Sequence, residues 1–195
     1  MSRGSGPERD LPECFISVDV ETGGATPGDY ALLSIGACLV DDPETTFYVE
    51  LKPEDKRTTQ EALEVSKMSL DILATMGEPP ADAMQRFADW VGEVVPEGFR
   101  AVFVGFNAPF DWMFVADYFE RYVGRNPFGF AALDIKAFAM GRLGGTWAET
   151  SMSVLGPRYL SGRPLAHHAL SDAQDQAALF RAIFAEPAPP RKDTP

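Results

Sequence analysis

The chain has little positive charge for its length. Its 195 residues include 17 Lys and Arg against 29 Asp and Glu, which gives a net charge of −12. Proteins that bind nucleic acid along its length do so largely by neutralising phosphates with Lys and Arg, so this balance argues against a long electrostatic interface. It favours a ligand that is held locally, at an end or in a cleft, and bound cations would offset part of the charge.

Long apolar runs and abundant cysteine are also missing. No run approaches the roughly 18 residues of a membrane span, so we expect no membrane partner. The stretch MSRGSGPERDLPE has no apolar core and predicts no secretory signal. Cys14 and Cys38 lie on separate strand-like segments without metal-ligand spacing, and we interpret them as reduced, buried thiols. These absences predict a cytoplasmic protein.

Apolar residues are plentiful enough for a folded domain. They make up 45% of the chain, with 11% aromatic residues, which excludes a disordered protein. The length predicts one domain. Polar ends rich in proline or charge predict flexible tails at 1–12 and 187–195, around one domain at 13–186.

The chain changes from strand-like to helical patterns along its length. The segments CFISVDV, YALLSIGACLVDD and TTFYVELKP predict three antiparallel strands with short connections. TQEALEVS, SLDILATMG and PADAMQRFADWVGEVV predict helices, with Met84, Phe87 and Val91 at helical spacing in the third. RAVFVGFN predicts a central parallel strand, and AALDIKAFAMG a short strand that continues into a helix. APFDWMFVADYFERYVG and SDAQDQAALFRAIFA complete the helices. This order predicts an α/β fold, a mixed sheet of about five strands flanked by helices.

Two carboxylates stand at the end of the first strand, in FISVDVETGG. Asp19 and Glu21 share one face of that strand, about 7 Å apart, and Gly23 and Gly24 then end it. A buried charge costs several kcal/mol unless something compensates it, about 2–7 kcal/mol even for a neutral polar group. The pair therefore indicates either a solvated strand end or a bound cation.

Two further acids begin helices. In VGFNAPFDWMF, Asn107 suits a helix cap, Pro109 fits the first turn, and Asp111 falls in that turn. In HHALSDAQ, Asp172 begins the last helix. Each acid is equally explained by the preference of helix N-termini for negative charge, with Ser171 as the cap of the last helix.

Taken together, the acids indicate a metal site. The end of a strand and the starts of helices meet at one edge of an α/β sheet, where ligands bind. Four converging carboxylates would repel one another unless divalent cations neutralise them. Two divalent ions balance four charges, and oxygen ligands suit Mg²⁺ or Mn²⁺.

The motifs DVET, NAPFD and HHALSD, in this order, resemble the three exonuclease motifs of the DEDD superfamily. The histidine version is similar to the DnaQ-like (DEDDh) branch, which includes ribonuclease T, oligoribonuclease and proofreading subunits. The resemblance runs from about Phe15 to Phe184. It implies a ribonuclease H-like fold and metal-dependent removal of nucleoside monophosphates from 3′ ends of single-stranded nucleic acid. It also implies a homodimer, as in ribonuclease T and oligoribonuclease.

The resemblance assigns a role to each motif residue. Asp19, Glu21 and Asp172 would hold one ion, and Asp19 and Asp111 the second. His167, five residues before the last aspartate, would be the general base that takes a proton from the attacking water. The neighbouring His168 falls where the family varies, so we expect no catalytic role for it.

Substrate contacts are predicted around the first two motifs. The backbone of Thr22 and Gly23 would lie beside the terminal nucleotide. Asn107 begins the second motif, and Phe106 and Trp112 flank it; aromatic faces stack on bases for roughly 1–3 kcal/mol each. Core packing is an equal alternative for Trp112. Upstream of the histidines, Arg158 and Arg163 would either hold phosphate or lie on a solvated loop.

The alternatives differ in substrate and in class. RNA or short oligonucleotides are favoured over DNA because the chain is one compact acidic domain without a polymerase or a long basic arm. A non-catalytic module that binds 3′ ends would be expected to have lost an acid or the histidine, and all five are present. A structural protein whose acids only cap helices predicts no tight divalent binding.

Overall fold

The structure is a computed structural model that describes residues 11–54, 57–59, 62, 67–161 and 167–187. The helix expected over TQEALEVS lies mostly outside these residues, as do Arg163 and most of both predicted tails.

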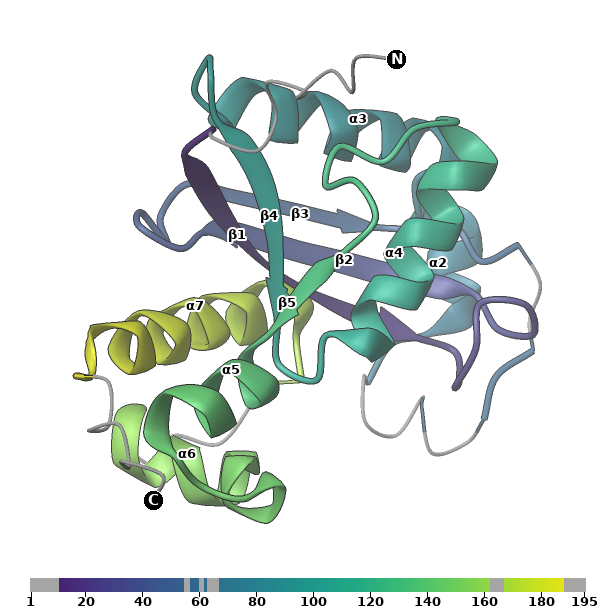
Figure 1. Ribbon diagram of the computed structural model, residues 1–195. Coiled ribbons are helices and arrows are strands. Elements are labelled where there is room, and N and C mark those ends of the chain that lie inside the picture. The colour runs from purple at the N-terminus through teal and green to yellow at the C-terminus, as the bar shows by residue number, and fades with distance from the viewer. Residues whose placement is uncertain (1–10, 55–56, 60–61, 63–66, 162–166, 188–195) are drawn as a thin grey trace, which may run out of the picture.

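A five-stranded mixed sheet forms the centre of the molecule (Figure 1). Its strands are β1 (Glu13–Thr22), β2 (Leu32–Leu39), β3 (Thr46–Glu50), β4 (Arg100–Gly105) and β5 (Ala132–Asp134). Their order across the sheet is β3-β2-β1-β4-β5. The first three strands are antiparallel neighbours, and β4 and β5 are added in parallel beside β1. The predicted mixed sheet is confirmed.

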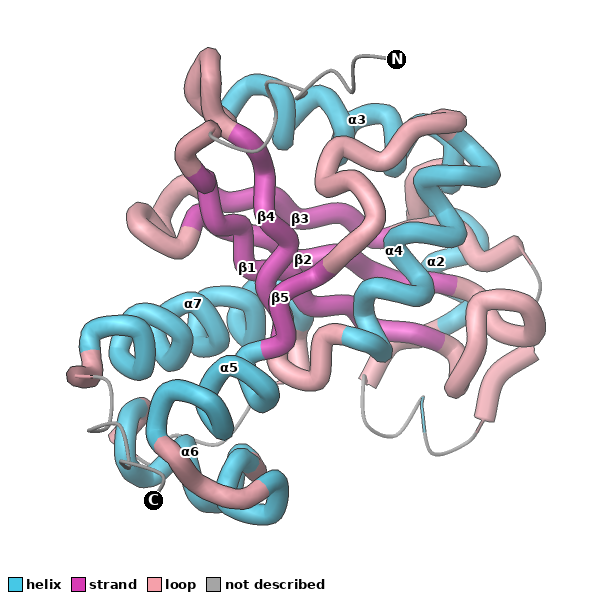
Figure 2. Tube along the Cα trace, in the orientation of Figure 1, coloured by secondary structure: helices cyan, strands magenta, loops and turns pink. Residues whose placement is uncertain are grey.

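Helices cover both faces of this sheet (Figure 2). One face carries α3 (Pro80–Val94) and α4 (Pro109–Tyr122), and the other carries α5 (Ile135–Leu143), α6 (Met152–Tyr159) and α7 (Ala169–Ala185). The short α2 (Leu70–Met76) follows β3 and contributes Leu73 to a small separate cluster. Within the described residues, none of the helices has the length and apolar character that crossing a bilayer requires.

The alternation of β1 decides which side chains reach each face. Ile16, Val18 and Val20 are buried in the core beneath α3 and α4, where the predicted stripe of α3 also packs. Phe15 points to the opposite face, where its ring lies 5.4 Å from that of Phe180 on α7. Since side chains two residues apart share a face, Asp19 lies on the α7 side as well.

The structure corrects several local expectations. Asn107 does not cap α4, because the cap position is taken by Ala108 and Asn107 itself adopts φ +64°. Likewise α7 begins at Ala169, two residues before the expected cap Ser171. Helix α6 and the 3-10 helix η2 (Trp147–Thr150) were not predicted. Gly156 and Pro157 lie inside α6, and both residue types disfavour helices, so the sequence of α6 is typical of a loop. The helix nevertheless packs on the core through the buried side chain of Leu155.

The expectation that both cysteines are buried was too simple. Cys38 is buried, but Cys14 is only half-buried; both are free thiols. On α7, Ala173, Ala177 and Phe180 are buried, whereas Phe184 is 52% exposed. Phe184 still contacts the ring of Phe138, so it covers the outer edge of the core.

Candidate active site

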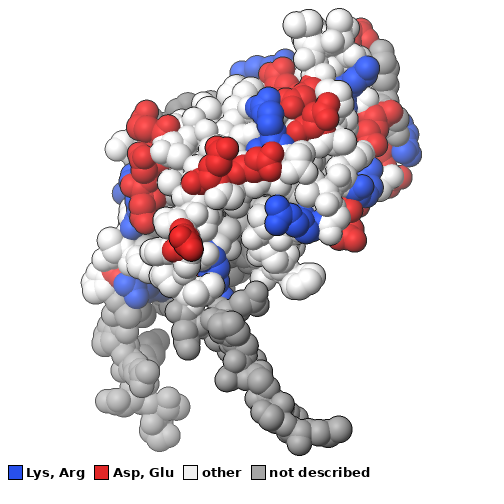
Figure 3. Space-filling model, turned by 90° about the horizontal axis from the view of Figure 1, so that it is seen from above, with Lys and Arg blue, Asp and Glu red and all other residues white. Residues whose placement is uncertain are grey.

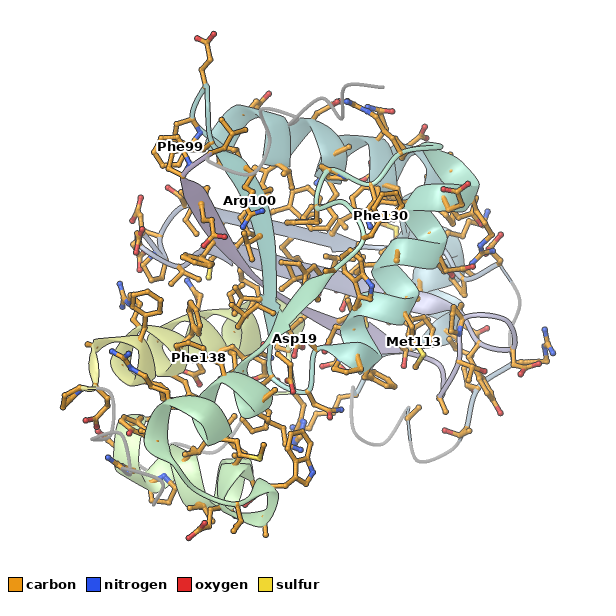
Figure 4. All side chains as sticks on the ribbon, in the orientation of Figure 1. Asp19, Phe99, Arg100, Met113, Phe130 and Phe138 are labelled. Atoms are coloured by element: carbon orange, nitrogen blue, oxygen red, sulfur yellow. The ribbon has the colours of Figure 1, made fainter. Side chains whose placement is uncertain are left out.

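Three carboxylates from β1 and α7 converge on the α7 side of the sheet. Asp19, Glu21 and Asp172 each offer an oxygen, and these oxygens all lie within 4.8 Å of one another. Figure 4 shows Asp19 between α4 and α5, far from Phe99 and Arg100 at the other end of the sheet. Asp172 on α7 is 6% exposed, and Asp19 and Glu21 at the end of β1 are half-buried, so α7 partly covers this strand end.

A glycine on β2 allows α7 to approach these strands. Gly36 is paired with Asp19 across β1 and β2. A Cβ atom at position 36 would lie 2.1 Å from the backbone nitrogen of Leu170 and 2.4 Å from the carbonyl oxygen of Ala169. Any side chain would therefore push the first turn of α7 off the sheet. The absence of a side chain at Gly36 brings Asp172 within reach of Asp19.

Asp111 approaches the same region from the first turn of α4. It is 4% exposed, and its Oδ1 accepts a hydrogen bond of 3.1 Å from the backbone nitrogen of Val20, between the two acids of β1. Burial raises the pKa of Asp111 to about 8, although the hydrogen bond from Val20 opposes the rise. The fourth predicted acid thus lies beside the cluster of three.

Burial and mutual repulsion destabilise the charged forms of these acids. The pKa of Asp19 is raised well above its usual value by burial and then by the charges of Asp111, Asp172 and Glu21. Burial and Asp172 raise the pKa of Glu21 to about 7. Clustered carboxylate oxygens in this state fit a divalent cation of the Mg²⁺ or Mn²⁺ type, whose charge would remove the repulsion.

Gln176 and Asp134 support the site and were not singled out in the sequence. Gln176 is 3% exposed; its Nε2 donates to Asp19 Oδ1 at 2.6 Å, and its Oε1 accepts from the Phe106 nitrogen at 2.9 Å. Its position four residues after Asp172 on a helix was the available signal. Asp134 caps α5 and accepts from the nitrogen of Ala108 at 3.2 Å, which ties β5 to the turn before α4.

The two histidines lie in different surroundings. His167 is exposed, adopts φ +51°, and lines a cavity of about 290 Å³ together with Glu21. His168 stacks on Tyr48 of β3, with ring centroids 4.7 Å apart and an angle of 19° between the rings. Both histidines are exposed and line the cavity that contains Glu21, so both have the access that a base needs; the ring of His168 is in addition stacked against β3.

The predicted substrate contacts are distributed between surface and core. Thr22 is the last residue of β1 and Gly23 follows it; both are buried, and the Thr22 hydroxyl donates to the Gly24 carbonyl at 2.8 Å. Asn107 is exposed near the site. Trp112 is half-buried with its ring 5.3 Å from that of Phe103, so it packs against the core.

Phe106 and Arg158 also make contacts within the molecule. The ring of Phe106 packs against the core cluster under α5 and α7, and the ammonium of Lys136 lies 6.0 Å from its centroid. Arg158, expected either to hold phosphate or to lie on a solvated loop, lies on α6 and pairs with Glu186 at 2.9 Å.

Comparison with known proteins decides the family. A model of the Rv2179c-like 3′-5′ exoribonuclease domain matches residues 14–184. The chain belongs to this family.

Two curated relatives match this chain over most of their own length. The 3′-5′ DNA exonuclease Cap18 of Escherichia coli is 46% identical over 171 residues, covering 88% of this chain and 91% of the relative. Ribonuclease T of Hahella chejuensis is 31% identical over 180 residues, covering 86% and 82%. These relatives and the family make the chain a 3′-5′ exonuclease of the DnaQ-like type.

Solved structures agree on the fold. The S. pombe Pop2p structure in its Mg²⁺- and Mn²⁺-bound form has a TM-score of 0.65 at 17% identity, covering 90% of this chain and 84% of Pop2p. The nuclease domain of 3′hExo, a DEDDh family member bound to rAMP, has a TM-score of 0.66 at 13% identity, covering 88% and 91%. The ribonuclease H-like fold class is confirmed.

Proposed function

We propose that this exonuclease removes nucleoside monophosphates one at a time from single-stranded 3′ ends, with RNA or short oligonucleotides as favoured substrates. The observation that carries the proposal is the group of Asp19, Glu21 and Asp172, whose oxygens lie within 4.8 Å of one another. Asp111, which is buried, adds a fourth carboxylate beside them. Four acids in this position suit two Mg²⁺ or Mn²⁺ ions, because two divalent cations balance four carboxylate charges.

The acids and the histidine have separate tasks in the proposed mechanism. Asp19, Glu21 and Asp172 would hold one ion, and Asp19, shared between the two ions, and Asp111 would hold the other. Bound there, the ions would supply positive charge that favours ionisation of the attacking water and stabilises the departing 3′ oxygen. His167 accepts the proton of that water, from a position that leaves its imidazole exposed beside Glu21.

Binding of the nucleic acid is local in this proposal. Figure 3 shows acidic and basic side chains interspersed on the face that it draws. With a net charge of −12, attraction to a long phosphate backbone is weak, so the 3′ end and its scissile phosphate carry most of the binding. The backbone of Thr22 and Gly23 at the end of β1, together with Phe106, Asn107 and Trp112, is proposed to contact the last nucleotides.

The relatives leave the choice of nucleic acid open to experiment. The family is described as exoribonucleases, and one relative is a ribonuclease, whereas the more similar relative is a DNA exonuclease. A DNA 3′-5′ exonuclease is therefore the alternative function.

A homodimer, proposed from the resemblance to ribonuclease T, is tested by sedimentation equilibrium. A cytoplasmic location is proposed because both cysteines are free thiols.

Degradation of end-labelled oligonucleotides tests the function. Matched single-stranded RNA and DNA, labelled at the 5′ end, are incubated with Mg²⁺ or Mn²⁺, and the shortening products are resolved by length. We expect a ladder that shortens from the 3′ end, with Asp172→Asn inactive. Asp82→Asn, an exposed acid in the first turn of α3, is the control and should retain activity.

Three outcomes are separable in this assay. Faster loss from RNA supports the favoured substrate, and faster loss from DNA supports the alternative. Tight retention of a 3′ end without cleavage by the unmodified protein would overturn catalysis in favour of an end-binding module.

A further inference from the structure

A short row of side chains begins where the parallel strands β4 and β5 end. In the register of these strands, Gly105 of β4 is paired with Asp134 of β5. Phe106 therefore follows one strand beside the first turn of α5, which follows the other and carries Lys136. This is the edge of an α/β sheet at which ligands bind. The nitrogen of Phe106 is also bonded to Gln176, which orients an acid of the site, so the row begins next to the acids.

Lys136 contacts two aromatic rings in this row. Its ammonium lies 6.0 Å from the centroid of the Phe106 ring and 4.3 Å from that of the Trp147 ring. Phe106 is half-buried, whereas Trp147 is 51% exposed. These three side chains form the aromatic row, which leads away from the acids to an indole that is open to solvent.

The charge of Lys136 is not balanced by a carboxylate. Three other cations in the described part of the chain lie over aromatic rings, and each of them also forms an ion pair: Arg86, Arg121 and Arg158. Lys136 forms no ion pair within the described residues. Its ammonium is therefore available to an anion such as a phosphate, to which a protein of net charge −12 offers few cations.

The backbone that carries Trp147 is firmly held. Trp147 begins η2, and the nitrogen and hydroxyl of its cap Thr146 donate to Glu149 Oε2 at 2.7 and 2.8 Å. The hydroxyl of Thr150, which is 3% exposed, donates to the Trp147 carbonyl at 2.7 Å. A rigid aromatic side chain on a fixed backbone loses little conformational freedom when it binds a flat ligand. Trp147 is therefore a preorganised stacking surface.

We propose that Lys136 and Trp147 bind the single strand upstream of the nucleotides at the acids, with the ammonium on a phosphate and the indole stacked on a base. The inference rests on the proposed function, because a 3′ end at the acids brings the upstream nucleotides to the aromatic row. It continues the surface assigned to the last nucleotides beyond Phe106. A phosphate contact and a stacked base are both independent of sequence, so the contact suits a strand of any sequence.

Binding without turnover tests the inference. Single-stranded RNA and DNA octamers and adenosine 5′-monophosphate are titrated by calorimetry with Mg²⁺, in an Asp172→Asn background that we expect to be inactive. The variants are Trp147→Ala, Trp147→Phe and Lys136→Ala. Arg125→Ala and Phe130→Ala are the matched controls, because both residues are exposed and line a cavity of about 1010 Å³ that contains neither the acids nor the aromatic row.

The two side chains should contribute to octamer binding in different ways. Trp147→Ala should raise the Kd about five- to hundredfold, the range for one base stacked on an aromatic ring, and Trp147→Phe should keep most of the affinity because a ring remains. Lys136→Ala should reduce the slope of log Kd against log salt concentration by about 0.7, the value for one phosphate contact on a single strand. Arg125→Ala removes the same net charge and should leave this slope unchanged.

Adenosine 5′-monophosphate separates the aromatic row from the acids, because one nucleotide at the acids does not extend to the row. Its Kd should be the same in all of these variants. Octamer binding no tighter than that of the mononucleotide would overturn the inference, as would an octamer Kd that Trp147→Ala raises no more than Phe130→Ala does. An unchanged salt slope in Lys136→Ala would overturn the phosphate contact.

The result is distinguishable from the outcome for the proposed function. Weaker octamer binding in Trp147→Ala supports the inference even if the unmodified protein cuts no oligonucleotide. Octamer binding that is independent of Trp147 and Lys136 overturns it even if the exonuclease assay yields the expected ladder.

Discussion

The two adjacent histidines of this site differ in one contact. His167 and His168 are both exposed and line the cavity that contains Glu21, but the ring of His168 is also stacked on Tyr48. His167→Ala should lower kcat about 10²- to 10⁴-fold, the usual contribution of a general base. His168→Ala should raise KM a few-fold and retain kcat, because it removes only a wall of the cavity. Initial rates on one oligonucleotide over a range of concentrations compare the two, and a larger kcat loss in His168→Ala would reverse their roles.

Gln176 is the residue whose contacts most directly position a metal ligand. Its two hydrogen bonds fix the orientation of the amide, so that Nε2 faces Asp19 and Oε1 faces the Phe106 nitrogen. Gln176→Met removes both bonds at similar volume. We expect about a tenfold loss of activity, since a buried group left unpaired costs about 1–3 kcal/mol. The Mg²⁺ concentration that gives half-maximal rate should rise.

A second glutamine on the same helix provides the control for this variant. Gln174 makes one hydrogen bond from its Nε2, to the Pro43 carbonyl at 2.8 Å, away from the acids. Gln174→Met should leave the Mg²⁺ requirement unchanged. If both variants lower the thermal midpoint while neither changes the Mg²⁺ requirement, Gln176 has a structural role alone.

At the scale of elements, the position of α7 depends on the close approach at Gly36. Gly36→Ala should destabilise the protein by about 1–3 kcal/mol, the usual cost of overpacking, because the clash is with backbone that cannot rotate away. It should also lower activity, since the first turn of α7 carries Asp172. Urea denaturation measures the first effect, and the oligonucleotide assay measures the second.

Gly92 of α3 is the matched control, because a Cβ atom there meets nothing within 4 Å. Gly92→Ala should stabilise α3 by about 0.4–1 kcal/mol and leave the rate unchanged. Full activity in Gly36→Ala would show that α7 reaches the site without this close approach.

For the whole molecule, the acid cluster links stability to divalent ions. The charges of Asp111, Asp172 and Glu21 all act against ionisation of Asp19. Mg²⁺ or Mn²⁺ should therefore raise the midpoint of thermal unfolding, and EDTA should reverse the increase. Asp19→Asn removes one charge and should raise the midpoint of the metal-free protein by about 2–4 °C, corresponding to about 1 kcal/mol at this size. It should also abolish most of the response to metal, and a full response in this variant would contradict the assignment of Asp19 as a shared ligand.

Sequence patterns determined the order of elements and the members of the acid group. The three antiparallel strands, the later parallel strands and the long helices have local periodicities that a reader of the sequence can count. DVET, NAPFD and HHALSD identified Asp19, Glu21, Asp111 and Asp172 as neighbours, and the structure places three of them within 4.8 Å with Asp111 beside them. Residue types and spacing are properties of the chain itself, so these features need no coordinates.

Contacts between distant segments were decided by the tertiary structure alone. The role of Gly36 depends on Leu170, that of Gln176 on Asp19, and that of Lys136 on Trp147. Helix α6 was missed for the same reason, because burial of Leu155 outweighs the helix-breaking character of Gly156 and Pro157. A glycine, a glutamine and a lysine carry no signal of their own, since their effect comes from the neighbours that folding brings to them.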